Sequence, residues 1–193
     1  MQGPNAADAG TMWKHHIIFV SALVASLLPF GSTDVIPKSF VYRNVSQYTV
    51  RYLSESGRDT GSCLANQDYP AALTSKLEYC RTLQFALTGS YNFFSENISR
   101  LIVLVRSGSY SFGATGIRIY HSNHIILSKL PGEEGEVLLS CNESTATSYN
   151  NLYYYNSSYL SVNDVVLSRC GEYSTALAAI SVWRLVVSNT TFR

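Results

Sequence analysis

Three stretches of the chain carry one pattern: HIILSKL (residues 124–130), YLSVNDVVL (159–167) and RLVVSNTTF (184–192). Aligned on their first residues, they share an aliphatic residue at the second position and again at the fourth. The second-position residues are Ile125, Leu160 and Leu185, and the fourth-position residues are Leu127, Val162 and Val187. The second and third stretches stay in phase, with Val165 over Thr190, Leu167 over Phe192 and Asp164 over Asn189. This alternation is typical of strands with one buried face.

The starts of these stretches are separated by 35 residues (124 to 159) and then by 25 (159 to 184). Unequal spacing with a constant inward pattern is typical of a solenoid that takes insertions at its corners. Short strands without helices between them predict an all-β fold, a parallel β-helix of about three incomplete coils. The alternative is an antiparallel β-sandwich, which also has short strands and polar turns.

A helix is expected near the start of this array, at residues 82–88. Thr82 is a suitable N-cap, apolar Leu83, Ala86 and Leu87 share one face, and Gly89 ends the pattern. We interpret this helix as a cap over the first coil, whose core and unpaired backbone would otherwise meet water. A Cys63–Cys80 disulfide would tie the preceding loop to it and contribute roughly 3 kcal/mol.

The N-terminal region predicts export. Lys14 precedes an apolar run from Ile17 to Phe30, which is short for a membrane span but suits a secretory signal. We expect residues 1–33 to be a signal peptide, with Met12 as an alternative start. The other interpretations are an uncleaved anchor and a buried core strand.

Cysteines and sequons agree with an extracellular chain. The four cysteines form an even set, and Cys141 and Cys170 each follow an apolar strand, so they are either a second disulfide or buried thiols. Five N-x-S/T sequons are expected glycosylation sites. They are Asn44, Asn97, Asn142, Asn156 and Asn189.

The expected organisation has three parts: the signal (1–33), a strand that ends at Gly57 with the disulfide loop and capping helix (34–96), and β-helix coils (97–193). The third part ends in phase with the other coils and shows no terminal cap, so we expect a truncated array rather than a natural terminus. The net charge of +1, with scattered basic residues, gives no basis for binding nucleic acid. Membrane attachment would require a further C-terminal part.

The stretch YLSESGRDTGSC…CRTLQFAL (52–87) resembles the opening motif of extracellular right-handed β-helix proteins of the pectin lyase-like superfamily, in particular those of invertebrate animals. The matching residues are Tyr52, Ser54, Gly57, Asp59, Cys63, Cys80, Arg81, Thr82, Leu83, Gln84 and Ala86. LIVLVRSGSY is similar to the first coil of that family, with Ser107 in place of a usual proline, and VNDVVLSRCG to a recurrent coil that includes Cys170 and Gly171. The resemblance covers about residues 50 to 193 and implies a right-handed fold and an extracellular location.

Enzymes of that superfamily use carboxylates on stacked strands, because glycosidic cleavage needs positioned acids or a bound metal. Asp164 is the only aspartate of the coil region, and we expect it to end a turn or to bond to Asn189. The acidic run Glu133, Glu134 and Glu136 suits a solvated corner, with loose calcium binding as the alternative. His121 and His124 suit an exposed corner better than a zinc or catalytic site. We expect no metal, no cofactor and no catalytic residue.

The best candidate binding surface is the tyrosine-rich stretch YNNLYYYNSSYL, since aromatic rows stack on sugar rings. Its candidate residues are Tyr149, Tyr153, Tyr155 and Tyr159. The alternative is that alternate tyrosines fill the core and the others pack on a corner.

The sequence therefore predicts a non-catalytic extracellular binding or scaffold module whose partner, a carbohydrate or an extracellular protein, is not identified. The competing hypotheses are a truncated polysaccharide lyase or glycoside hydrolase of the same fold, and an inert fragment.

Overall fold

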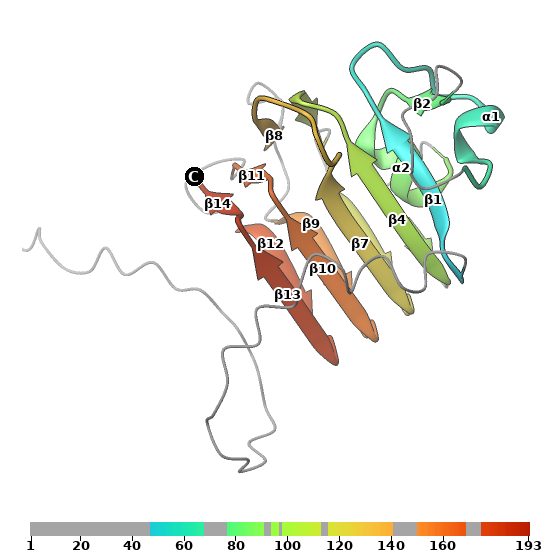
Figure 1. Ribbon diagram of the computed structural model, residues 1–193. Coiled ribbons are helices and arrows are strands. Elements are labelled where there is room, and N and C mark those ends of the chain that lie inside the picture. The colour runs from blue at the N-terminus through green and yellow to red at the C-terminus, as the bar shows by residue number, and fades with distance from the viewer. Residues whose placement is uncertain are drawn as a thin grey trace, which may run out of the picture.

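The computed structural model describes residues 47–67, 77–90, 94–96, 98–112, 116–140, 150–168 and 175–193. Strands dominate this part of the chain, and they form three parallel sheets (Figure 1). Sheet A contains β2 (Tyr79–Cys80), β1 (Thr49–Leu53), β4 (Arg100–Val105), β7 (His124–Lys129), β10 (Tyr159–Asn163) and β13 (Arg184–Ser188). Sheet B contains β3 (Phe94–Glu96), β6 (Ile117–Tyr120), β9 (Asn150–Tyr155) and β12 (Thr175–Ile180). Sheet C contains β5 (Gly108–Ser111), β8 (Val137–Ser140), β11 (Val166–Leu167) and β14 (Thr191–Phe192).

Every strand pairing among the described residues is parallel, so the antiparallel sandwich is excluded. From β4 onward the strands follow one another through sheets A, C and B and then return to A. Each round therefore adds one layer to all three sheets.

The predicted registers are confirmed. Leu160 pairs with Ile125 on one side and Leu185 on the other, and Val162 pairs with Leu127 and Val187 in the same way. Leu167 pairs with Phe192, as the alignment of the repeats predicts. Alternation along each strand sends these residues inward, so aliphatic side chains stack in columns through successive layers.

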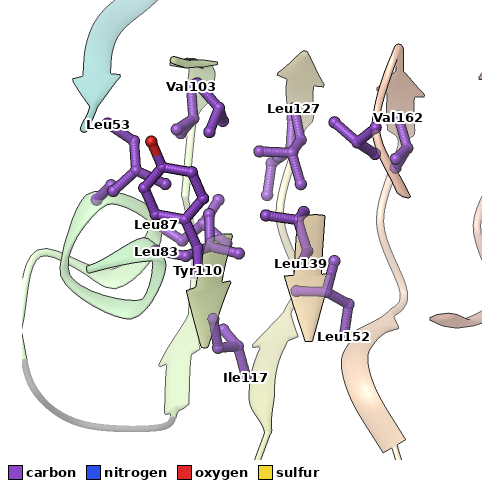
Figure 2. Packing of buried hydrophobic residues seen from close by; sticks show 14 of the residues in the cluster. Leu53, Leu83, Leu87, Val103, Tyr110, Ile117, Leu127, Leu139, Leu152 and Val162 are labelled. Carbon is purple, nitrogen blue, oxygen red and sulfur yellow. The ribbon is translucent and has the colours of Figure 1, made fainter. Parts of the chain in front are cut away.

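The interior between the sheets is a single apolar cluster (Figure 2). Val103, Leu127 and Val162 follow one another along sheet A, and Leu139 and Leu152 face them from sheets C and B. Burial of this apolar surface is the main stabilising contribution, at about 25 cal/mol per Å² removed from water.

Two short helices lie beside β1: α1 (Gly61–Leu64) and α2 (Leu83–Thr88). The predicted caps of α2 are confirmed, because Thr82 Oγ1 accepts a hydrogen bond from Phe85 N (3.2 Å) and Gly89 adopts a left-handed φ of 76°. α2 packs against β1, β2 and β4, and Leu83 and Leu87 are buried in the interior cluster.

The disulfide and an aspartate hold the loop before α2. Cys63 and Cys80 are bonded, with their Cα atoms 5.2 Å apart, which confirms the predicted pair. The carboxylate of Asp59 accepts hydrogen bonds from Arg81 N (2.7 Å), Thr82 N (3.0 Å) and Thr82 Oγ1 (2.8 Å). A negative charge there also favours the helix N-terminus electrostatically.

An arginine of β1 points inward and bonds to the C-terminal end of α2. Arg51 lies on β1 in register with Val103, and its Nη1 donates to Ala86 O over 2.6 Å. Burial lowers the pKa of Arg51. A cation at this end complements the helix dipole.

Three details differ from the sequence prediction. The strand expected to reach Gly57 ends at Leu53, because the chain turns and Gly57 N bonds back to Ser54 O (2.9 Å). α1 was not predicted. The outer face of sheet A is also apolar and buried across β1, β4 and β7, where alternation would place polar residues. This second cluster contains Val50, Tyr52, Ile102, Leu104, Ile126 and Leu130.

Bends between sheets repeat from layer to layer. His121, Asn156 and Ser181 follow successive strands of sheet B, and their φ angles are 51°, 52° and 54°. Asp164 and Asn189 form a second such row, with φ angles of 56° and 46°. Asn and Asp tolerate this left-handed conformation better than other side chains do, which explains the polar bends.

Gly57 lies where no side chain fits, and Gly61 offers a matched control. An added Cβ at Gly57 would lie 2.4 Å from Cys80 O and 2.6 Å from Tyr79 O, whereas at Gly61 it would meet nothing within 4 Å. We predict that Gly57→Ala lowers the free energy of unfolding by about 1–3 kcal/mol, as overpacking typically does. Gly61→Ala should be neutral or stabilise by up to about 1 kcal/mol. Urea denaturation of both variants is the measurement, and equal effects would contradict this geometry.

Candidate functional site

Strand β9 divides the tyrosine-rich stretch between the interior and the surface. Leu152 and Tyr154 are fully buried, whereas Tyr153 is partly exposed and Tyr155 is 38% exposed. Burial raises the pKa of Tyr154, and its hydroxyl has no hydrogen-bond partner among the residues that the structure describes. Both interpretations of this stretch therefore apply in part. Tyr154 fills the core, as the second interpretation has it, and its neighbours Tyr153 and Tyr155 face outward, as a binding surface requires.

A third tyrosine joins the outward pair on sheet B. Tyr120 pairs in register with Tyr155, and its ring centroid lies 5.7 Å from that of Tyr153 and 6.0 Å from that of Tyr155. We call Tyr120, Tyr153 and Tyr155 the tyrosine cluster. Partial burial, followed by the neighbouring phenols, raises the pKa of Tyr153. Tilted rings at these distances pack favourably and form one aromatic surface over two layers.

Small and apolar residues of the next layer lie beside the tyrosine cluster. In the next layer Ala178 pairs with Tyr153 and Ile180 pairs with Tyr155, and Ile180 is 39% exposed. The exposed Arg118 pairs with Tyr153 on the other side. Glu96 of β3 occupies the register position beside Tyr120. The cluster thus combines aromatic faces with charged residues on neighbouring strands, and sugar rings can stack on the first and bond to the second.

The bend that follows β6 and β9, at His121 and Asn156, lies beside the tyrosine cluster. The His121 ring lies 6.3 Å from the Tyr155 ring, and His121 Nδ1 is 2.9 Å from Asn156 Nδ2. The next residues along the chain, Ser122 and Ser157, are buried, and their hydroxyl oxygens are 2.7 Å apart. Both His121 and Asn156 are exposed, so a glycan on Asn156 would lie beside Tyr155.

Tyr159 belongs to a different surface, because the corner turns the chain into sheet A. Its ring stacks on His124 with centroids 5.1 Å apart, and Arg184 lies over the other side at 6.0 Å. The row continues through the first layers, where Tyr48 Oη is 3.0 Å from His124 Nδ1 and Arg100 lies 6.0 Å over the Tyr48 ring. We call these five residues the arginine–aromatic row.

Burial, followed by the Arg100 charge, lowers the pKa of His124. Burial also raises the pKa of Tyr48, although Arg100 opposes this shift. The arginine–aromatic row therefore holds a neutral imidazole between two cations at neutral pH.

Sequence reasoning missed Tyr120 and most of the arginine–aromatic row. Tyr120 precedes Tyr155 by 35 residues, the offset that separates His124 from Tyr159, so the repeat itself carried this signal. Tyr149 lies outside the described residues, as do Cys141, Cys170, Asn44, Asn97 and Asn142 and the expected signal sequence 1–33. Asn156 and Asn189 are exposed at bends.

Three carboxylates beyond the first layer are engaged in local bonds. Asn189 Nδ2 donates to Asp164 Oδ1 over 3.0 Å, which confirms the predicted contact. Glu133 pairs with Arg106 at 2.7 Å and Glu136 pairs with Arg193 at 3.0 Å. These contacts fit the interpretation of the acidic run as a solvated corner.

One group of metal-ligating side chains comes together in the described part of the chain: Asp59, Cys63 and Cys80, whose ligand atoms lie within 4.8 Å of one another. The two sulfurs are bonded to each other, and the carboxylate caps α2. This donor set therefore serves the fold.

Searches found no matching family model, no matching curated protein and no matching solved structure. Neither helix in the described ranges has the length and apolar character needed to cross a membrane.

The surroundings of His124 predict its pKa and the pH dependence of folding stability. We expect a pKa below the ordinary 6.5, and Arg100→Ala should raise it part of the way, since burial is the larger cause. As the pH falls, His124 is protonated at a higher pH in the unfolded chain than in the folded protein. The free energy of unfolding therefore falls as the pH drops below about 6.5. His124→Gln should remove this component. NMR titration of labelled histidine is the direct measurement, and a pKa at or above 6.5 would contradict the proposed burial.

Proposed function

We propose that the protein is an extracellular right-handed parallel β-helix that acts as a non-catalytic binding module. The parallel pairings, the A–C–B order of the strands and the inward columns support the coiled architecture. The resemblance of residues 52–87 to β-helix proteins supports the right-handed sense. In this proposal α2 is the cap of the first coil.

Its location outside the cell is supported by three features. The Cys63–Cys80 disulfide is stable in an oxidising compartment. Asn156 and Asn189 are exposed within sequons, which suits glycosylation. The N-terminal apolar run suits a secretory signal.

The tyrosine cluster is the observation that carries the binding function. Its outward rings lie on adjacent parallel strands, whose spacing of about 4.8 Å is comparable with the width of a sugar ring. Rigid strands hold such rings in place before a ligand arrives, which reduces the entropy lost on binding. We assign neutral carbohydrate as the ligand class, and an extracellular protein is the second candidate.

The competing function is that of a polysaccharide lyase or glycoside hydrolase with this fold. Such an enzyme needs two free carboxylates, or a metal site, beside a groove. In the described part of the coils, Asp164, Glu133 and Glu136 each bond to a neighbouring side chain. The observations therefore favour a binding module.

The tyrosine cluster predicts the effect of single substitutions on carbohydrate binding. We expect the secreted protein to bind neutral oligosaccharides on a glycan array. Tyr153→Ala and Tyr155→Ala should each weaken binding by about 2- to 10-fold, the value of one aromatic contact. Tyr153→Phe should retain most of the affinity, because the ring face remains.

Tyr159→Ala is the matched control, since it removes a partly exposed ring from the arginine–aromatic row instead. Calorimetric titration of the best array ligand measures all four variants. If neither Tyr153→Ala nor Tyr155→Ala changed carbohydrate binding, the tyrosine cluster would not be the binding site. Absence of any bound glycan would contradict the ligand class.

A further inference from the structure

Two rings of the tyrosine cluster lie side by side on neighbouring strands. Tyr120 of β6 and Tyr155 of β9 are register partners, and paired strands are about 4.8 Å apart. Both side chains point outward, and their ring centroids are 6.0 Å apart with an angle of 54° between the ring planes. Side chains at the surface rotate on the picosecond to nanosecond timescale, so carbons of the two rings come into contact repeatedly.

Exposure distinguishes this pair from a second close pair of tyrosines. Tyr52 and Tyr79 are also register partners, with ring centroids 5.8 Å apart. Tyr52 is fully buried, however, and Arg106 lies 5.8 Å over the Tyr79 ring. Tyr155 is 38% exposed and Tyr120 is partly exposed. A reagent in solution therefore reaches the rings of Tyr120 and Tyr155 but not the ring of Tyr52.

Tyr153 is the other ring neighbour of Tyr120, at 5.7 Å between centroids, but it is less well placed for a reaction. Its register partner is Arg118, so it reaches Tyr120 only along a diagonal between the strands. Burial raises the pKa of Tyr153, which makes the loss of its hydroxyl proton harder. The pair in register therefore has the better geometry and the more accessible phenol.

We propose that Tyr120 and Tyr155 form a site of oxidative cross-linking, at which a carbon–carbon bond between the two rings joins β6 covalently to β9. The oxidant class is hydrogen peroxide used by a peroxidase. The inference rests on the proposed function only for the extracellular location, where a secreted chain meets such an oxidant.

The reaction removes one hydrogen from each tyrosine. Each phenol loses one electron and its hydroxyl proton and becomes a phenoxyl radical. The two radicals couple through the ring carbons next to the oxygen-bearing carbons, and the hydrogen of each coupled carbon moves to the oxygen to restore the phenol. The two electrons and two protons that leave the protein reduce one molecule of hydrogen peroxide to two molecules of water.

The strands favour coupling within one molecule. They hold the two rings together at a high effective concentration, so coupling between molecules is slower in dilute solution. The new bond would close a loop of 35 positions, from 120 to 155. It would restrict the unfolded chain as the Cys63–Cys80 disulfide does, and would tie two adjacent layers together.

The test treats the full chain, secreted and with its disulfide intact, with a peroxidase and hydrogen peroxide in dilute solution. N-glycans are then removed, because Asn156 adjoins Tyr155, and the monomer is digested for peptide mapping by mass spectrometry. We expect one pair of peptides joined through Tyr120 and Tyr155, lighter than the sum of the two by two hydrogen atoms. The oxidised monomer should also show the blue fluorescence of a biphenol and a higher melting temperature than the untreated protein.

Phenylalanine variants provide matched controls, since they keep each ring and remove only the hydroxyl. Tyr120→Phe and Tyr155→Phe should each abolish the cross-link, because neither variant can form both radicals. Tyr153→Phe and Tyr159→Phe should retain it. Near-UV circular dichroism and thermal melting before oxidation establish that all four variants are folded.

An oxidised monomer without a bond between Tyr120 and Tyr155 would overturn the proposal. A bond from Tyr120 to Tyr153 in its place, or a cross-link that survives Tyr155→Phe, would overturn the assignment to the pair in register. Peptide mapping needs no carbohydrate, so failure of the cross-link and failure of carbohydrate binding are separate results.

Discussion

The structure depends on the stacking of inward aliphatic side chains in register on parallel strands. Val162 contacts the layers on both sides, with Leu127 before it and Val187 after it. A shift of one residue in a parallel strand would turn every inward residue outward, so the columns fix the register of all three sheets together. Each layer is also the hydrogen-bonding partner of the next. The stability of any strand is therefore shared with its neighbours, as in other repeat arrays.

Among the described strands, the layer that contains β1 is held by contacts other than a preceding layer of the three sheets. There α2 supplies apolar side chains, Asp59 accepts hydrogen bonds at the helix N-terminus, and Arg51 donates to one carbonyl near its C-terminus, that of Ala86. The disulfide fixes the loop that brings Asp59 into position. In the layer that contains β13, Leu185 and Val187 are partly exposed.

Sequence periodicity was sufficient for the columns, for the caps of α2 and for the contact between Asp164 and Asn189, because each depends on a local pattern repeated at a fixed offset. The tyrosine site was predicted only in part. Tyr153 and Tyr155 lie together, but the bend at Asn156 turns Tyr159 onto sheet A, and alternation alone cannot locate a bend. Tyr120 and Arg184 lie at the repeat offsets of 35 and 25 residues from Tyr155 and Tyr159, so the repeat carried their positions although residue type alone did not. The second apolar face of sheet A was missed for a related reason, since covering of both faces depends on segments distant in sequence.

The most direct test of the central claim is an NMR measurement of contacts between methyl groups in selectively labelled protein. In-register parallel stacking predicts strong contacts from Leu127 to Val162 and from Val162 to Val187, with none from Leu127 to Val187, which lie two strand spacings apart. The same experiment should join Ile125 to Leu160 and Leu160 to Leu185. Absence of the contacts between neighbouring layers, or a pattern in which Ile125 meets Val162 and Leu127 meets Leu160, would contradict parallel stacking.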